Sequence, residues 1–258
     1  MKKYVILLAV VILGSCKNKP NKEVIITDKY MENTISIGAK VIYGEANKIN
    51  RNDIVVFKDP SQNKLSCLRI VGMPGEKIEI IRGLIFINGK EYHFPESSKM
   101  IYTVYSKIND NFSVLADYDF KNYNANYGMV YVTKKQVDEI KAKKLVDSIY
   151  PLGFDSFTVL PEIVRVSTSK YSNPYYFGPV IIPNIGDTIF KKDEMLIFHF
   201  SKFDNDYQIV DDNFYFCIGD GFSDARDSRQ LGLIPKERIV GRVTHIDNIT
   251  VINVDVPQ

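Results

Sequence analysis

The sequence predicts a mostly β protein of antiparallel strands, interrupted by one inserted α+β segment. Short runs rich in Val, Ile, Tyr and Phe recur in both halves of the chain, and residues that favour tight turns, such as Gly and Asn, separate them. From residue 92 to residue 170 this pattern stops, and Tyr, Asn, Asp and Lys become frequent. The two flanking regions are therefore expected to form one β core around an inserted subdomain.

The first half of the β core is expected over residues 24–91. Its strands are predicted at residues 24–26, 40–43, 53–57, 68–72, 77–81 and 84–88, where the apolar runs lie. The pair Asn88-Gly89 predicts a two-residue hairpin after the last of these runs, because both residue types tolerate the positive φ angles of the turns that suit twisted strands.

One helix is expected inside the inserted segment, over residues 133–147. Thr133 can cap its first turn, and Val137, Ile140, Leu145 and Val146 can form an apolar stripe. The polar face of this helix is rich in Lys, which is typical of a solvated surface, with contact to membrane headgroups as the alternative.

The second half of the β core is expected over residues 171–258. Strand-like runs resume at residues 177–183 and continue at 195–200, 213–218, 238–246 and 250–254. No repeat of fixed period is visible in the sequence.

The first sixteen residues are predicted to be an export signal that ends in a lipid-attachment cysteine. Lys2 and Lys3 precede an apolar run of about ten residues, which is too short to span a bilayer. Residues 13–16 (LGSC) match a bacterial lipobox, so Cys16 is expected to carry acyl chains that anchor the protein to a membrane. Residues 17–23 are then a polar tether. An ordinary secretory signal is the alternative, and both place the mature chain in the bacterial envelope, facing the periplasm or the exterior.

The composition argues against a nucleic-acid-binding protein and against a metal centre. The chain has 33 basic and 31 acidic residues, a formal net charge of +2, so it lacks the charge excess that a phosphate backbone attracts. Its three His residues are scattered without metal-ligand spacing, and no metal or other cofactor is predicted. Cys67 and Cys217 lie in apolar runs and are predicted to be buried, unpaired thiols, with a disulfide as the alternative in an exported chain.

Four segments, in a fixed order along the chain, carry a family resemblance. They are residues 30–35 (YMENTI) followed by Gly38, residues 52–60 (NDIVVFKDP), residues 68–76 (LRIVGMPGE) with 87–90 (INGK), and residues 219–235, which begin with GDG and end with DSRQLGLIP. This pattern resembles bacterial signal peptidase I, the membrane-bound endopeptidase that removes export signals. The resemblance implies a signal peptidase I-like core of antiparallel strands.

The resemblance also implies a set of catalytic positions, and all four depart from the family pattern. Family members use a serine nucleophile and an uncharged lysine base, assisted by further hydroxyls. Here Tyr30 stands at the nucleophile position and Leu68 at the base position. Asp28 stands where an oxyanion-assisting serine is expected, and Ala225 where a lysine-orienting serine is expected. A carboxylate at position 28 would repel the negative charge that develops during acyl transfer.

The residues that the resemblance assigns to the architecture are present. They are Gly72, Pro74, Gly75, Gly219, Asp220, Asp227 and Arg229. Asp227 and Arg229 are expected to form a structural ion pair. Tyr30 is expected to fill the volume of a disused cleft, with stacking on a bound partner as the alternative.

No nearby residue is expected to replace the missing base. Arg69 adjoins Leu68 but stays protonated in proteins. Lys64 lies four residues earlier on the same strand, roughly 13 Å away along an extended chain. Lys29 would point away from the side chain of Tyr30 if that stretch is extended.

The sequence therefore favours a catalytically inactive, signal peptidase I-like envelope lipoprotein with a peptide-binding or scaffolding role. Its expected partners are a membrane, through Cys16, and an extended peptide or preprotein that adds as a strand, because strand addition uses main-chain hydrogen bonds and needs no nucleophile. One alternative is an active signal peptidase I or related serine endopeptidase with a rearranged site. Another is a structural subunit of an envelope assembly, which contacts an envelope protein partner through the Tyr-rich insertion.

Overall fold

The computed structural model describes residues 21–32, 34–60, 62–95, 99–106, 112–124, 126–151, 176–190, 206–221, 225–246 and 249–250. The export signal with Cys16, most of the polar tether and the strand expected at 195–200 lie outside these residues. So does most of the strand expected at 250–254. Within the described residues, no helix is long and apolar enough to cross a membrane.

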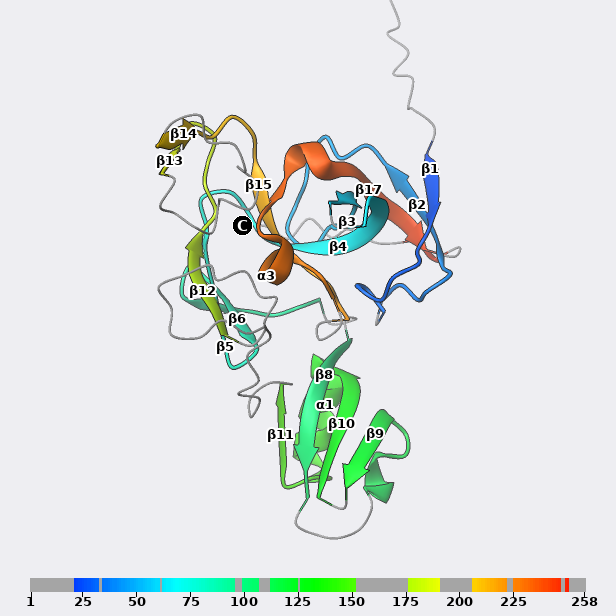
Figure 1. Ribbon diagram of the computed structural model, residues 1–258. Coiled ribbons are helices and arrows are strands. Elements are labelled where there is room, and N and C mark those ends of the chain that lie inside the picture. Colours follow the sequence, from blue (N-terminus) through cyan, green and yellow to red (C-terminus); the bar gives the residue numbers. More distant parts are fainter. Residues whose placement is uncertain are drawn as a thin grey trace, which may run out of the picture.

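The core is an eight-stranded antiparallel sheet built from both ends of the chain (Figure 1). Its strands, in spatial order, are β1 (Lys22–Ile25), β2 (Lys40–Gly44), β17 (Ile239–Ile246), β3 (Ile54–Asp59), β4 (Lys64–Gly72), β15 (Phe214–Ile218) and β16 (Ile234–Pro235), with β18 (Ile249–Thr250) beside β17. The late strand β17 pairs with β2 on one side and with β3 on the other. The main sheet therefore forms only when strands from both halves of the core pair with one another.

A second antiparallel sheet contains β12 (Tyr176–Ile181), β5 (Lys77–Ile81), β6 (Leu84–Ile87) and β7 (Lys90–Tyr92), in that order. The predicted hairpin is confirmed, since Ile87 pairs with Lys90 across Asn88 and Gly89, whose φ angles are 51° and 79°. The strands β13 (Thr188–Phe190) and β14 (Tyr207–Ile209) form a separate two-stranded ribbon.

Packing between the first two sheets is tight at the end of β4. A Cβ atom at Gly72 would lie 2.5 Å from Cδ1 of Ile182 and 2.8 Å from Cδ1 of Ile78. Contacts this short do not occur for real Cβ atoms, so any side chain at residue 72 would force the ends of these two isoleucines to move.

The inserted segment folds as a four-stranded antiparallel sheet with one helix. The strand order is β11 (Ser148–Pro151), β8 (Lys99–Tyr105), β10 (Tyr127–Thr133) and β9 (Asp119–Asn124). The helix α1 (Lys134–Ala142) follows β10 directly, and a short 3-10 helix, η1 (Ser113–Leu115), precedes β9. Val137 and Ile140 of α1 are buried in a cluster with side chains of this sheet. Figure 1 shows the segment as a green unit at one end of the molecule.

The predicted helix is present but shorter than expected. Thr133 caps it in a reciprocal capping box with Gln136, as the sequence indicated for the start. At the other end, Lys144 adopts a φ of 51°, and the N–H of Leu145 donates to the carbonyl of Ile140 at 3.1 Å. This left-handed turn ends the helix at Ala142, so the apolar residues beyond it continue the periodic pattern without being helical.

One further expectation is corrected, and two short helices were not foreseen. The tether was predicted to extend to residue 23, but β1 already begins at Lys22, because residues 22–25 pair with residues 40–43 of β2. Within the described residues, the α-helix α3 (Ser228–Leu231) and the 3-10 helix η2 (Lys236–Arg238) were not foreseen, because both are too short to be recognised from periodicity.

The expected fold class is confirmed: the described chain is mostly β, with antiparallel sheets and an α+β insertion. Cys67 and Cys217 are both buried and free, as predicted. Burial raises the pKa of each thiol well above its ordinary value, so neither is a reactive thiolate.

Candidate functional site

The fold brings the four family positions together at one place, and all four are buried. Tyr30 lies in the turn after β1, Leu68 in the middle of β4, and Ala225 just before α3; the three belong to one apolar cluster. Their exposed fractions are 4%, 0% and 2%, and that of Asp28 is 8%. The positions that the resemblance assigns to a catalytic centre therefore present almost no surface to solvent.

The phenol of Tyr30 is held by two polar side chains. Its hydroxyl donates to Oδ2 of Asp59 at 3.0 Å, and Nε2 of Gln62 donates to the same hydroxyl at 2.8 Å. Asp59 ends β3 and Gln62 lies in the turn that leads to β4. The ring occupies the position where the resemblance expects a nucleophile, and its hydroxyl end is held by Asp59 and Gln62.

These surroundings keep the phenol protonated. Burial raises the pKa of Tyr30 above its ordinary value, and the nearby carboxylates of Asp59 and Asp28 raise the pKa further. A phenol that donates to a carboxylate and resists deprotonation is a poor nucleophile, because attack requires the phenolate.

Asp28 is engaged in structural contacts. Its carboxylate accepts from the N–H of Tyr30 at 3.1 Å and from Oγ of Ser66 at 2.7 Å, and it lies 3.7 Å from Nζ of Lys64. These contacts tie the turn after β1 to β4 and offset the cost of burying a carboxylate.

The side chain of Lys64 and the backbone around Lys29 do not lie as an extended strand geometry predicted. The long side chain of Lys64 brings its amine to Asp28, although its backbone is four residues from Leu68. This amine contacts Asp28 and Thr27, whereas the Tyr30 hydroxyl contacts Asp59 and Gln62. The stretch around Lys29 is a turn rather than an extended strand, since the N–H of Glu32 donates to the carbonyl of Lys29 at 3.2 Å.

The turn that carries Tyr30 packs directly against two glycines. The N–H of Gly221 donates to the carbonyl of Tyr30 at 3.0 Å. A Cβ at Gly219 would lie 2.3 Å from the same carbonyl oxygen, and one at Gly221 would lie 2.4 Å from the carbonyl oxygen of Lys29. Only residues without a side chain allow this backbone approach.

Between these glycines, Asp220 is the hub of a buried polar network. Nε of Arg69 donates to Oδ1 of Asp220 at 2.9 Å, and Nη2 donates to Oδ2 at 2.5 Å. Thr34 also donates to this carboxylate, and the Asp220 side chain is fully buried. Arg69, which the sequence excluded as a base, therefore has a structural task beside the family site.

The expected ion pair of the last motif is present and fully buried. Arg229 donates to Asp227 through Nε at 2.8 Å and through Nη2 at 2.6 Å. Asp227 also caps α3 and accepts from the N–H of Gly219 at 3.1 Å. The pair fixes α3, and with it Ala225, against β15.

The remaining motif residues shape the turn between β4 and β5. Pro74 and Gly75 form the turn, and Gly75 has a φ of 83°. Its N–H donates to the carbonyl of Ile182 at 2.7 Å. Glu76 closes the turn by accepting from the N–H of Met73 at 2.8 Å and from Arg51. These contacts are architectural, and Met73 of the same turn packs against the apolar cluster that contains Tyr30.

Sequence reasoning missed the side chains that hold Tyr30 and Asp28, namely Asp59, Gln62 and Ser66. Only Asp59 lies in a recognised motif, and that motif gave no reason to aim its carboxylate at position 30. Among the described residues, no group of three or more His, Cys, Asp and Glu side chains is placed to hold a metal ion.

Comparison with known proteins decides the family. A family model described as "Signal peptidase, peptidase S26" matches residues 2–246. The chain belongs to this family.

Curated relatives include the signal peptidase I of Buchnera aphidicola subsp. Baizongia pistaciae, which is 27% identical over 206 residues, covering 78% of this chain and 56% of that protein. The signal peptidase I of Rickettsia typhi is 22% identical over 205 residues, covering 78% and 53%. This chain therefore spans about half the length of the curated relatives it matches. A crystal structure of a signal peptidase I from Enterococcus faecalis V583 aligns with a TM-score of 0.33 and 16% identity, covering 77% of this chain and 98% of that one.

Replacing Tyr30 by Phe is expected to destabilise the fold by about 1–2 kcal/mol, because Asp59 loses a buried donor and Gln62 loses its acceptor. The free energy of unfolding in urea, followed by circular dichroism, measures the loss. Tyr43→Phe is the matched control: Tyr43 is also buried, at 5% exposure, but its hydroxyl has no hydrogen bond among the described residues. Equal losses in the two variants would contradict the assigned bonds.

Proposed function

We propose that this member of the signal peptidase family is a catalytically inactive lipoprotein of the bacterial envelope, which binds or scaffolds other proteins. The observation that carries the proposal is that Tyr30, which stands where the resemblance expects the nucleophile, is a buried phenol that donates to Asp59. The base position is filled by the fully buried side chain of Leu68.

The chemistry of amide hydrolysis explains why these two replacements matter. An attacking hydroxyl needs a neighbouring group that accepts its proton. Leucine cannot accept a proton, and the carboxylate of Asp59 already accepts from a phenol whose raised pKa favours the neutral form. In addition, Asp28 places a carboxylate beside the position where an oxyanion would develop, which disfavours the transition state.

A binding role agrees with the parts of the family framework that are retained. Buried ion pairs at Asp220 and Asp227 hold the turns around the site, so the scaffold is ordered without a reactive centre. Strand addition is a mode of peptide binding that needs only unpaired main-chain groups at a sheet edge. Because the four family positions are buried, we place such binding at another strand edge.

The envelope location rests on family membership and on the export signal with its lipobox at residues 13–16. Cys16 would anchor the protein after cleavage of the signal, and the chain beyond it would lie outside the cytoplasm. Stable anchoring to a membrane needs two lipid chains or a comparable second signal, and a diacylated cysteine carries two chains.

The purified full-length protein is expected to leave a preprotein uncut. The assay is incubation with a preprotein that an active signal peptidase I cleaves in a parallel reaction, with products identified by mass spectrometry. Cleavage at a defined bond by this protein, abolished in the Tyr30→Phe variant, would refute the proposal and support the alternative of an endopeptidase with a rearranged site.

The mature chain is expected to begin at Cys16 and to carry acyl chains on it. Expression of the full chain in a bacterium that processes lipoproteins, followed by mass spectrometry of the N-terminal peptide, measures both. The Cys16→Ser variant is expected to lose the modification, while the Cys67→Ser variant keeps it because Cys67 is buried in the core. A mature N-terminus at another residue, without lipid, would contradict the anchoring.

A further inference from the structure

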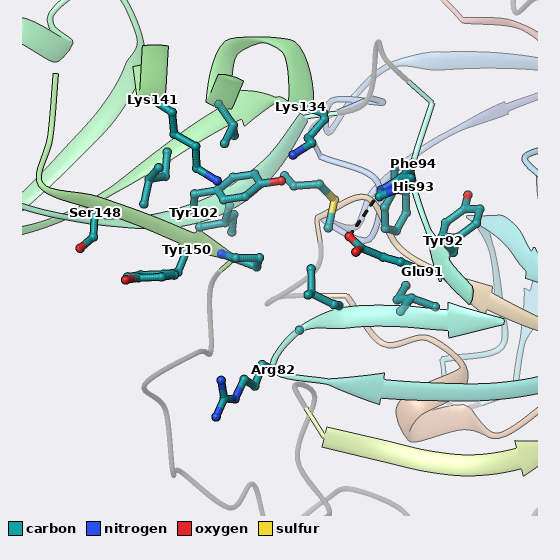
Figure 2. Close-up of a pocket in the computed structure, with 18 of the residues that line it drawn as sticks. Arg82, Glu91, Tyr92, His93, Phe94, Tyr102, Lys134, Lys141, Ser148 and Tyr150 are labelled. Atoms are coloured by element: carbon teal, nitrogen blue, oxygen red, sulfur yellow. Dashed lines mark ion pairs between the residues drawn. The ribbon is translucent and has the colours of Figure 1, made fainter. Parts of the chain in front are cut away.

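A cavity of about 600 Å³ lies between the second sheet and the inserted segment, and none of the four family positions lines it (Figure 2). One wall comes from β6, β7 and the residues that follow them, including Tyr92 and Phe94. The opposite wall comes from β8, α1 and β11, including Tyr102 and Ile149. Its volume falls within the range of natural ligand sites.

Two sheet edges line this cavity. β7 is the last strand of the second sheet and β11 is the last strand of the inserted sheet, as far as the described residues show. Both walls include these strands: all four residues of β11, Ser148–Pro151, and residues 91 and 92 of β7. An edge strand has main-chain donors and acceptors along one side that can pair with another extended chain.

The charge around the cavity is predominantly basic. Arg82, Lys134, Lys141 and Lys144 line it, against the acidic residues Glu91 and Asp147. Glu91 already lies 3.5 Å from His93, and Lys134 lies 3.3 Å from Asp138. Within the part of the chain that the structure describes, the amines of Lys141 and Lys144 have no acidic partner within 4.0 Å. The cavity is therefore complementary to a ligand that carries carboxylates.

The interior of the cavity is apolar and aromatic. Phe94, Met100 and Val137 contribute apolar surface, and Tyr92 and Phe94 pack edge to face with ring centroids 5.2 Å apart. In Figure 2, the ring of Tyr102 points into the cavity between Lys134 and Lys141. Apolar side chains of a ligand would be buried here while acidic side chains meet the amines.

We propose that this cavity binds an extended acidic peptide segment, which adds as a strand along β11 and directs its carboxylates to Lys141 and Lys144. Alternation of side chains along a strand suits this surface, because one face of the peptide enters the apolar interior and the other faces the basic rim. The inference adds a site and a ligand class to the proposed binding role. It does not depend on the absence of catalysis, so cleavage of a preprotein would refute the proposed function without changing the outcome expected here.

The test uses a fluorescein-labelled eight-residue peptide of alternating Glu and Val, titrated with the full-length protein and followed by fluorescence anisotropy. Saturable binding that weakens as salt is added is expected, because the amines lie at the surface. The matching peptide of alternating Lys and Val is expected not to bind. Lys141→Glu should weaken binding of the acidic peptide about tenfold or more. Lys135→Glu, an exposed position on the same helix that does not line the cavity, should leave the affinity within about twofold.

Main-chain pairing is tested with the same acidic peptide N-methylated at alternate residues, in both registers. One register should lose binding, because its methyl groups replace the N–H donors that face β11. Equal affinity of the wild type and the Lys141→Glu variant, or full binding in both methylated registers, would overturn the proposal. Saturation by oleate without any binding of the acidic peptide would also overturn it, since the occupant would then be a lipid.

Discussion

The close approach between the turn that carries Tyr30 and the glycines at positions 219 and 221 is the constraint on which the site depends. It joins an early segment to one that lies about 190 residues later, at a separation that admits no Cβ atom on the glycines. The bidentate pair of Arg69 and Asp220 holds this junction from inside the sheet. The late strand β17 also pairs with two early strands, β2 and β3. The core therefore depends on contacts between residues that are far apart in the sequence.

The residues that hold the fold together differ from those at the positions that the resemblance assigns to catalysis. Removing one member of a buried ion pair leaves an uncompensated charge and costs about 3–5 kcal/mol, so Asp220 and Asp227 contribute strongly to the stability of the fold. Positions 30 and 68, which the resemblance assigns to the nucleophile and the base, do not take part in these buried ion pairs. A leucine at position 68 adds buried apolar surface to the cluster, and Tyr30 fills volume while its hydroxyl reaches Asp59. A stable framework is therefore compatible with tyrosine at position 30 and leucine at position 68.

Much of the fold followed from local signals in the sequence. Strand positions came from apolar runs, the β6–β7 hairpin from Asn88 and Gly89, and the start of α1 from Thr133. The end of α1 was missed because Lys144 adopts a left-handed conformation, and a Lys in the sequence gives no reason to expect one. The order of the four motifs along the chain was enough to predict that Tyr30, Leu68 and Ala225 lie together, because the family resemblance implies that these positions share one site. The partners Asp59, Gln62 and Ser66 could not be predicted, because side-chain direction in a turn depends on packing that no local pattern encodes. The cavity was likewise invisible, since its two edge strands come from separate sheets.

The ionisation of Tyr30 tests the central claim most directly. The protein, with ¹³C-labelled tyrosine, is titrated with base, and the ring resonance of Tyr30 is assigned as the signal that disappears in the Tyr30→Phe variant. A buried phenol that donates to Asp59 is predicted to stay neutral through pH about 10, the ordinary pKa of tyrosine, and to shift only above it. A resonance that titrates near neutral pH would show an activated phenolate at the nucleophile position and would contradict the account.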